Sequence, residues 1–371
     1  MGGDWSELLQ DLLVMIAKRI QLVEDFTAFS GVCTSWRAAA SKQNFEKSWP
    51  TLPMLMLAEK KDSDDREFYS LSRGKIWRTL PLPEAKGKKC IETRGWLLTI
   101  TSSGDMKLLH PFSRVQIELP HLTFPYYECD EYEDGEERPY SFIRRAVLSA
   151  NPSETSNFVL MVVHSCGTNL GFWRSGDKSW TGIVSRQGAF SDVNYHNGKF
   201  YAISYGGQIW SWDVTAPDLT VAQRIFCIDV ALIRCRESYV VESSGELLIV
   251  SRDGAGISSD CETYGATNFR VIQLDIMKSR WNELSSLGER AIFVGFNGAF
   301  SVDSTSFPGI IRPNCIYFTD DSDEAFRYTN SQLGGGKDMG VYNLEDGKIE
   351  RFEDVRSFSL ICPPIWVSPS L

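Results

Sequence analysis

The sequence predicts a mainly β protein that begins with a small helical module. Its hydrophobic pattern changes abruptly near residue 50. Before that point, apolar residues recur every three or four positions, as on one face of a helix. After it, short apolar runs alternate with clusters of Gly, Asn, Asp and Ser, which is the pattern of strands and turns. The chain has 371 residues and is 43% hydrophobic, so it can bury a large core as one large domain or two unequal ones.

Three helices are expected in the first part of the chain. The segment SELLQDLLVMIAKRI (6–20) carries leucines and isoleucines at three- and four-residue steps, as in an amphipathic helix. Asp25 could cap a second short helix over residues 26–29. The segment VCTSWRAAASK (32–42) is rich in alanine and makes a third. Pro50 then ends the helical region.

A weak internal repeat indicates how the strands are organised. Each copy has an apolar strand, a polar turn with Gly, Asp or Ser, and a Trp or aliphatic residue that opens the next strand. Copies occur at 69–80, 107–119, 170–183, 271–284 and 340–352, with a more divergent one at 201–214. Repeats of this kind are typical of β-propeller blades, which recur about every 40–50 residues. The spacings here are uneven, so the loops must vary in length. With four strands per blade, we predict about six blades over residues 52–367, with seven as the alternative.

The last segment of the chain is apolar, although free tails are usually polar. It reads FSLICPPIWV from Phe358 to Val367. By strand count, the first blade has only three strands before residue 80, whereas the last blade is full by Phe352. We therefore expect the tail to supply the missing strand of the first blade and to close the ring, because an open blade leaves unpaired edges. The alternative is a tail that lies across the propeller base or against the helices.

The helical segment resembles a known interaction module. A Trp-Ser start, the helix LLQDLLVMIAKRI, a D-F-x-x-F step and the element VCTSWRAAA occur in the order found in F-boxes. We assign residues 4–45 to this module. The F-box is a three-helix module that docks onto the Skp-type adaptor of cullin–RING ubiquitin ligases. One position departs from the pattern, since F-boxes usually carry Leu-Pro where this chain has Leu8-Leu9.

The resemblance implies which side chains form the surface that faces the adaptor and the core of the module. They are Leu8, Leu9, Leu12, Leu13, Ile16, Ile20, Val32, Cys33 and Trp36. The sequence does not separate residues that touch the adaptor from residues that hold the three helices together. For Val32, Cys33 and Trp36, the alternative is that they pack on the propeller.

The strand-rich part, residues 52–367, is similar to the C-terminal propeller of plant F-box proteins of the KIB type. Six segments carry this resemblance: HPFSRVQIELP (110–120), DVNYHNGKFYAIS (192–204), YVVESSGELLIVSR (239–252), SLGERAIFVGFNGAFSV (286–302), PNCIYFTDD (313–321) and GVYNLEDGKIE (340–350). His110 stands where family members usually have Asn. The family supplies no catalytic residue that could be assigned to this chain.

Composition argues against several other functions. The net charge is −10, and phosphate contacts need clustered Lys and Arg, so we expect no nucleic-acid binding. The four histidines show no metal-ligand spacing, and no phosphate-binding loop or nucleophile elbow occurs. We therefore expect no metal, cofactor or catalytic residue. The nine cysteines are scattered without a C-x-x-C pair, which favours the reduced cytoplasm or nucleus.

No stable membrane association is expected either. The N-terminus lacks the basic region of a secretory signal, and the longest apolar runs are too short to cross a bilayer. The start MGGDWS fits the pattern for N-myristoylation at Gly2. A single acyl chain binds membranes only marginally when no polybasic segment follows it. The sequence leaves open whether Gly2 is acylated.

The two parts together predict a substrate-recognition subunit of an SCF-type ubiquitin ligase. The helical module would bind the Skp-type adaptor, and the propeller would bind a target protein that the sequence does not name. Such a chain is not itself an enzyme, because other subunits catalyse the reaction. Leu9 in place of proline favours one alternative, a propeller scaffold with a degenerate F-box. A second alternative, a propeller enzyme, would need ionisable groups that converge in a deep pocket.

Overall fold

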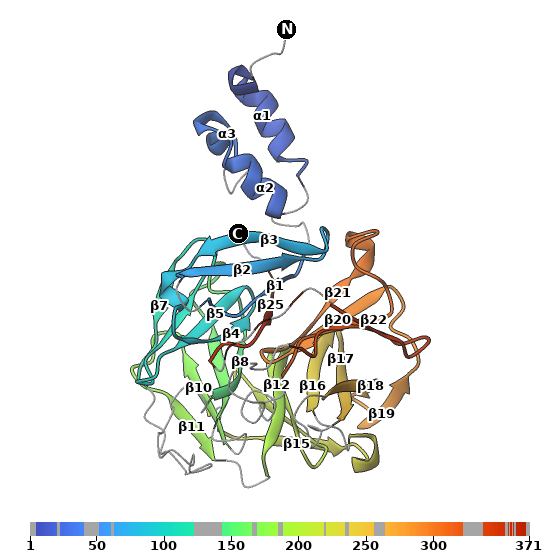
Figure 1. The fold of residues 1–371 in the computed structure, drawn as a ribbon. Helices are drawn as coiled ribbons and strands as arrows, with labels where there is room; N and C mark the ends of the chain where they lie inside the picture. Colours follow the sequence, from blue (N-terminus) through green and yellow to red (C-terminus); the bar gives the residue numbers. More distant parts are fainter. Residues whose placement is uncertain are drawn as a thin grey trace.

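The computed structural model describes residues 5–20, 23–40, 52–60, 63–121, 143–164, 169–184, 188–218, 220–233, 237–255, 264–321, 337–352, 355, 357, 359 and 361–368. The first two ranges are helical, and most of the others consist of strands and turns. Figure 1 shows the helices outside a ring of sheets, next to the first sheet. The prediction of a mainly β fold with a small N-terminal helical part is confirmed.

Three α-helices follow a single 3₁₀ turn in the described N-terminal part. They are η1 (Trp5–Glu7), α1 (Gln10–Ala17), α2 (Val23–Ser30) and α3 (Thr34–Ala39). The expected cap at Asp25 is wrong, because α2 already begins before this residue. Cys33 is the N-cap of α3, with extended backbone angles of φ −161° and ψ 179°. Val32 and Cys33 therefore precede the third helix instead of lying on one of its faces.

The described strands form six sheets, which confirms the predicted six blades. The first sheet holds β1 (Met54–Met56), β2 (Asp65–Ser70), β3 (Lys75–Pro81) and β25 (Ile365–Val367). The second holds β4 (Lys89–Thr93), β5 (Trp96–Ile100), β6 (Met106–Leu109) and β7 (Gln116–Glu118). The third holds β8 (Ile143–Leu148), β9 (Val159–His164), β10 (Asn169–Arg174) and β11 (Thr181–Val184).

The remaining three sheets follow in chain order. The fourth holds β12 (Phe190–His196), β13 (Lys199–Ser204), β14 (Gln208–Asp213) and β15 (Gln223–Cys227). The fifth holds β16 (Glu237–Ser243), β17 (Glu246–Ala255), β18 (Gly265–Asp275) and β19 (Arg280–Leu284). The sixth holds β20 (Arg290–Gly295), β21 (Gly298–Asp303), β22 (Cys315–Phe318), β23 (Gly340–Asn343) and β24 (Ile349–Arg351). Short 3₁₀ turns lie between strands: η2 (Pro83–Ala85), η4 (Val230–Leu232) and η5 (Ser304–Ser306).

The inner strands meet at the centre of the ring. β4, β8, β12 and β16 contact one another in turn. In the sixth sheet β21 contacts β16 and β20 contacts β25, and β25 contacts β4, so the circle is complete. The sixth sheet departs from the expected four strands, because it has the order β21-β20-β22-β23-β24 and β20 pairs with β22 in parallel. The added strand β21 contacts both β16 and β12, so it occupies part of the space along the axis.

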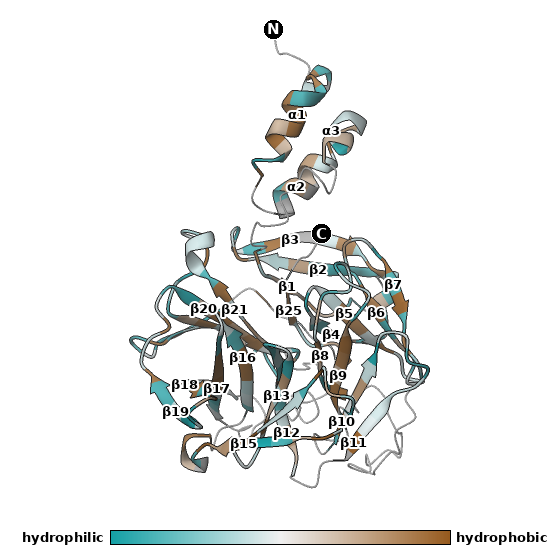
Figure 2. Cartoon of the chain, turned by 180° about the vertical axis from the view of Figure 1, so that it is seen from behind, coloured by the Kyte–Doolittle hydropathy of each residue, from teal (hydrophilic) through white to brown (hydrophobic). Residues whose placement is uncertain are grey.

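Apolar side chains fill the space between neighbouring sheets. β9 is buried at all of its positions, which explains its unbroken apolar run VLMVV. Figure 2 shows hydrophobic residues concentrated on strands such as β9, with hydrophilic residues at many turns. Trp96 of the second sheet and Trp173 of the third belong to one buried cluster, which packs these two sheets together.

The C-terminal strand closes the ring, as predicted. β25 pairs antiparallel with β1, and Trp366 lies opposite Leu55. The three residues of β25 are at most 1% exposed, and the Trp366 ring packs edge-on against Phe293 of the sixth sheet with centroids 5.0 Å apart. Ser357 Oγ also accepts a hydrogen bond from the Ala58 amide at 2.6 Å. The two ends of the propeller therefore share one sheet.

A buried arginine connects several sheets near the axis. Arg145 of β8 is 2% exposed, and its Nε lies 3.2 Å from Asp192 Oδ1 of β12. Its Nη1 donates to the Phe296 carbonyl between β20 and β21 at 2.7 Å. Asp192 Oδ2 in turn accepts from the Val240 amide of β16 at 2.8 Å. Burial raises the pKa of Asp192 to about 6, and the Arg145 charge opposes this rise.

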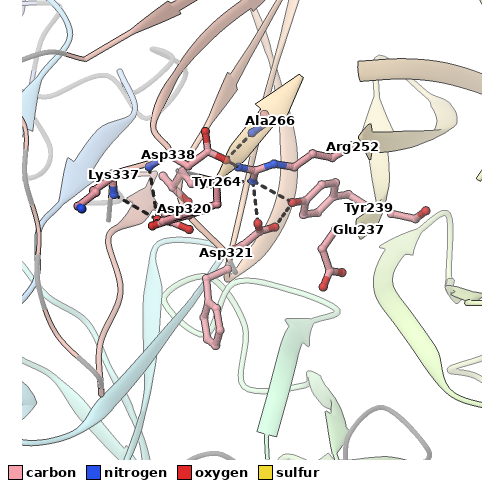
Figure 3. A network of polar contacts seen from close by, with 12 residues as sticks. Glu237, Tyr239, Arg252, Tyr264, Ala266, Asp320, Asp321, Lys337 and Asp338 are labelled. Atoms are coloured by element: carbon pink, nitrogen blue, oxygen red, sulfur yellow. Dashed lines mark hydrogen bonds and ion pairs between the residues drawn. The ribbon is translucent and has the colours of Figure 1, made fainter. Parts of the chain in front are cut away.

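A second buried network, drawn in Figure 3, holds the fifth sheet to the sixth. Arg252 of β17 is fully buried, and it donates to Asp321 Oδ1 at 2.8 Å and to Asp338 Oδ2 at 2.5 Å. Asp338 Oδ2 also accepts from the Ala266 amide at 2.7 Å, and the Tyr239 hydroxyl donates to Asp321. Asp321 and Asp338 lie on either side of a segment outside the described residues. One arginine side chain therefore holds Asp321 and Asp338 close to each other.

We expect a chain that ends at Ser357 to unfold at a lower temperature than the full chain. The deletion removes three apolar side chains that each contribute about 1.5–3 kcal/mol when fully buried. It also exposes the edge of β1. The expected loss lowers the midpoint by roughly 10 °C or more, which thermal unfolding followed by circular dichroism measures. A chain that ends at Ser368 keeps β25 and is the control; equal midpoints for all three chains would exclude the closing role.

Candidate functional site

The three helices enclose a small apolar core of their own. Its buried members are Leu13, Ala17, Phe26, Phe29 and Ala39. Trp36 packs its ring against Phe29 with centroids 4.5 Å apart, and its Nε1 donates to the Trp5 carbonyl at 3.1 Å. The module is therefore held together without a contribution from the propeller core.

The structure divides the nine predicted residues by exposure. Those that hold the helices together are buried or half-buried: Leu8, Leu13, Ile20 and Trp36. Those that are exposed, by between 37% and 73%, are Leu9, Leu12, Ile16 and Val32. Cys33 is half-buried at the N-cap of α3. Contact between any of them and an adaptor stays a prediction.

Two further exposed residues were missed by sequence reasoning. Leu13 and Ala17 of α1 face the module core, whereas Met15 is 50% exposed on the same helix. Trp5, before α1, is 69% exposed. The sequence did contain a signal for Met15, because residues three positions apart, such as Leu12 and Met15, lie on the same face of a helix. We call the whole set the exposed apolar residues of the module: Trp5, Leu9, Leu12, Met15, Ile16 and Val32.

Leu9 has the backbone conformation that proline would have. It is the N-cap of α1, with φ −57° and ψ 138°. Its carbonyl accepts from the amides of Leu12 and Leu13 at 3.0 and 3.2 Å. A proline ring fixes φ at about −65 ± 15°, and the Leu9 angle lies within this range. The absence of the proline typical of F-boxes therefore leaves the geometry of the helix start intact.

We expect Leu9→Pro to be tolerated and to stabilise the start of α1 by about 0.4–1 kcal/mol, because proline restricts the unfolded chain. The measurement is hydrogen–deuterium exchange of the α1 amides in the full chain. Met15→Pro is the matched control, since Met15 lies in the interior of α1 and a proline there costs about 3 kcal/mol. Faster exchange in Leu9→Pro than in the unchanged chain would contradict this expectation.

The helical module meets the propeller at the turn between β2 and β3. Arg73 Nη2 lies 3.2 Å from Asp25 Oδ1 of α2, and both side chains are exposed. Exposed ion pairs contribute about 0–1 kcal/mol, so this contact is weak. Val32 is 56% exposed, so the propeller does not cover it. Residues 41–51 lie outside the described residues, so the bounds 4–45 and 52–367 stay predictions.

The propeller has a pocket of about 550 Å³ at the ends of its inner strands. Side chains from the β4–β5 turn, β12, β16 and the β20–β21 turn line it, and Ser368 follows β25 into its wall. Met54 pairs with Val367, the residue before Ser368. The chain therefore enters the propeller from the helical module at the end of the strands where this pocket lies.

Glu92 is the buried acid of this pocket. It is 5% exposed, and its Oε1 accepts from the Gly95 amide at 2.8 Å. Its Oε2 accepts from Asn297 Nδ2 at 3.3 Å, and the Ser368 amide also donates to this carboxyl group. Burial raises the pKa of Glu92 to about 7, and the hydrogen bonds oppose this rise. Glu92 thus joins the second sheet to the sixth sheet and to the end of the closing strand.

The raised pKa of Glu92 makes the stability of the propeller depend on pH. Burial favours the neutral acid, so folding takes up a proton between the ordinary pKa of 4.5 and the folded value of about 7. This contribution to stability is complete below pH 4.5 and is lost as the pH rises through 7. A pKa difference of this size corresponds to about 3 kcal/mol.

We expect Glu92→Gln to remove the loss of stability that ionisation of Glu92 causes as the pH rises. The variant should gain stability relative to the unchanged chain as the pH rises from 4.5 to 8, because the amide does not ionise. Urea unfolding at several pH values measures the free energy of unfolding of both chains. Glu345→Gln makes the same chemical change at an exposed residue and is the control. Two curves that stay parallel over this range would show that Glu92 does not titrate as inferred.

The described part of the chain shows no site for a metal ion. It contains no group of three His, Cys, Asp or Glu side chains placed to bind one. No helix in the described ranges is long and apolar enough to cross a membrane. Gly2, the residue of the acylation motif, lies outside them.

The helical module and the closed ring together define the class of this protein. A chain in which a three-helix F-box precedes a six-bladed propeller has the organisation of a plant F-box protein. The family model "KIB1-4 beta-propeller" matches residues 68–343, and the chain belongs to this family.

The chain is similar to proteins named as F-box proteins over nearly their full length. The chain is 24% identical to "F-box protein SKIP23" of Arabidopsis thaliana, over 98% of this chain and 96% of that protein. It is 25% identical to "F-box protein At2g17036" of the same plant, over 99% of this chain and 95% of that protein.

Proposed function

We propose that this protein is the substrate-recognition subunit of an SCF-type ubiquitin ligase. In this proposal the F-box binds a Skp-type adaptor and through it a cullin–RING ligase. The propeller binds the target protein, and other subunits catalyse ubiquitin transfer, so the chain itself is not an enzyme. The names of its relatives support an F-box role.

The observation that carries the proposal is the exposure of large apolar residues on a module whose core is already complete. Leu9, Leu12 and Ile16 are between 37% and 73% exposed. Burying such a side chain completely contributes about 1.5–3 kcal/mol, and the module alone realises only part of this. Apolar residues that gather on one small module favour a protein partner. Leu13 and Ala17 fill the core without them.

The conformation of Leu9 bears on the scaffold alternative. That alternative depended on the absence of proline at the start of α1, yet Leu9 already has a proline-like φ of −57°. The absence of proline is therefore a weaker argument that the F-box is degenerate. Adaptor binding by the unchanged chain separates the two functions directly, because a scaffold of this kind would not bind.

We also propose a location in the nucleus or cytoplasm, on the basis of the scattered cysteines. The acidic net charge supports a protein target and not a nucleic acid. No stable membrane association forms part of the proposal.

The test is co-purification with a Skp-type adaptor. We expect Leu12→Asp with Ile16→Asp to lower adaptor affinity by roughly 100-fold or more, because two carboxylates would be buried without partners. Both positions are exposed, so the module should keep its fold. Met277→Asp with Val221→Asp is the matched control, because these side chains are 95% and 67% exposed on the propeller.

Two outcomes would overturn the assignment. Adaptor binding that is undiminished in the Leu12→Asp, Ile16→Asp chain would show that α1 does not face the adaptor. The absence of adaptor binding by the unchanged chain would favour the scaffold. Circular dichroism and hydrogen exchange of α1 verify that each variant is folded.

A further inference from the structure

The central pocket of the propeller carries more negative than positive charge. Its charged lining residues are Glu92, Arg94, Glu154 and Glu242. Arg94 can neutralise only one of the two carboxylates at Glu154 and Glu242, so at least one negative charge is left even when Glu92 is neutral. A concave site with low-dielectric walls strengthens the field of such a charge.

The pocket already accommodates one cation, which comes from the chain itself. Arg94 lies in the turn between β4 and β5, and its guanidinium carbon is 5.5 Å from the centroid of the Tyr195 ring. Its Nε donates to the Leu148 carbonyl at 2.8 Å. The guanidinium also interacts electrostatically with Glu242 and Glu154. An aromatic face beside carboxylates is a favourable environment for a cation.

A buried acceptor in the pocket wall lacks a donor. Asn297, in the β20–β21 turn, is 5% exposed and lines the pocket. Its Nδ2 donates to Glu92 Oε2 and to the Trp366 carbonyl, both at 3.3 Å. Its Oδ1 has no hydrogen-bond partner among the described residues. An unpaired buried acceptor costs about 1–3 kcal/mol, so a ligand that brings a donor would be favoured.

We propose that this pocket is where the propeller holds its target, and that it takes a lysine or arginine side chain of the target protein. This inference rests on the proposed function, because it names the target-binding site of the same propeller. A basic side chain has only donors and a positive charge, which matches the excess carboxylate and the unpaired oxygen of Asn297. Its aliphatic stem can cover the apolar part of the lining, which includes Ala146, Val193 and Ala299.

The arrangement favours binding over catalysis. Both oxygens of Glu92 accept hydrogen bonds, from the Gly95 amide and from Asn297 Nδ2. These hydrogen bonds give Glu92 a structural role, because they join segments that meet where the ring closes. The described residues of the lining include serines but neither His nor Cys, so they form no nucleophile–base pair of these residue types.

The test uses the purified full chain and short peptides. Acetyl-Gly-Arg-Gly-amide and acetyl-Gly-Lys-Gly-amide are titrated by saturation-transfer NMR. Acetyl-Gly-citrulline-Gly-amide has nearly the shape of the arginine peptide without its charge and is the matched control. We expect the citrulline peptide to bind at least about tenfold more weakly, because it lacks the charge interaction. Equal binding of the arginine and citrulline peptides, or no binding of either basic peptide, would overturn the proposal.

Three variants locate the binding in the pocket. Glu154→Gln with Glu242→Gln should lower the affinity for the arginine peptide about tenfold. Glu345→Gln, outside the pocket, should leave this affinity unchanged. Arg94→Asn should strengthen binding several-fold, because it removes the competing cation and frees the Tyr195 ring. Asparagine tolerates the φ of 50° at this position. A gain in affinity cannot come from damage to the fold. Unchanged binding of the arginine peptide in both the Glu154→Gln, Glu242→Gln chain and the Arg94→Asn chain would overturn the assignment.

Failure of this inference is distinguishable from failure of the proposed function. The peptide titration does not involve the adaptor, and adaptor co-purification does not involve the pocket. A Glu154→Gln, Glu242→Gln chain should therefore bind the adaptor as the unchanged chain does. If the adaptor binds but the basic peptides do not, the proposed ligase role is supported and the pocket assignment is wrong. If the peptides bind but the adaptor does not, the pocket assignment is supported and the proposed ligase role is wrong.

Discussion

Closure of the ring is the constraint on which the rest of the structure depends. Each sheet of a propeller packs against two neighbours, so the first and last sheets must meet before any inner strand is fully covered. β25 meets this requirement by pairing with β1 and by placing Trp366 against Phe293 of the sixth sheet. Glu92 adds polar links between the second sheet, the β20–β21 turn and the residue after β25. The pocket exists only in the closed ring, because its wall includes Ser368.

Buried charges near the axis give the ring a defined arrangement more than a large net stability. Arg145 is 2% exposed and is linked to Asp192 and to the Phe296 carbonyl, so it joins sheets that are distant in the sequence. Arg252 does the same for the fifth and sixth sheets. The desolvation of such groups offsets much of their attraction, whereas removal of one partner leaves a buried charge unpaired. These networks therefore penalise other packings of similar sheets.

The two candidate interaction sites differ in their chemistry and lie on different parts of the chain. The F-box exposes apolar residues that its own core does not use, which suits a permanent protein contact. The propeller pocket is polar and acidic, and its chemistry is suited to selection of one kind of side chain. A weak ion pair between Arg73 and Asp25 is the polar contact described between the two parts. Each site can therefore be altered by mutation with little effect on the other.

The sequence by itself predicted the order of the parts, six blades with seven as the alternative, and the closing role of the tail, and the structure confirms all three. These follow from local features: hydrophobic periodicity, turn residues and the missing strand of the first blade. It also identified nine residues of the module, because helical spacing and order are visible along the chain. It did not determine the fifth strand of the sixth sheet. Asn297-Gly298 marks the turn between β20 and β21, but the sheet that the resulting strands join depends on packing around the ring.

Only the tertiary structure decided which residues are free to bind. Leu13 and Leu12 are adjacent and chemically identical, yet packing of α1 against its neighbours buries one and exposes the other. The pocket was invisible in the sequence because its parts come from several sheets, and Glu92 and Asn297 are 205 positions apart. Burial, unpaired acceptors and shifted pKa values arise from contacts between distant segments. Local sequence patterns carry no record of those contacts, so these properties appear only once the ring is closed.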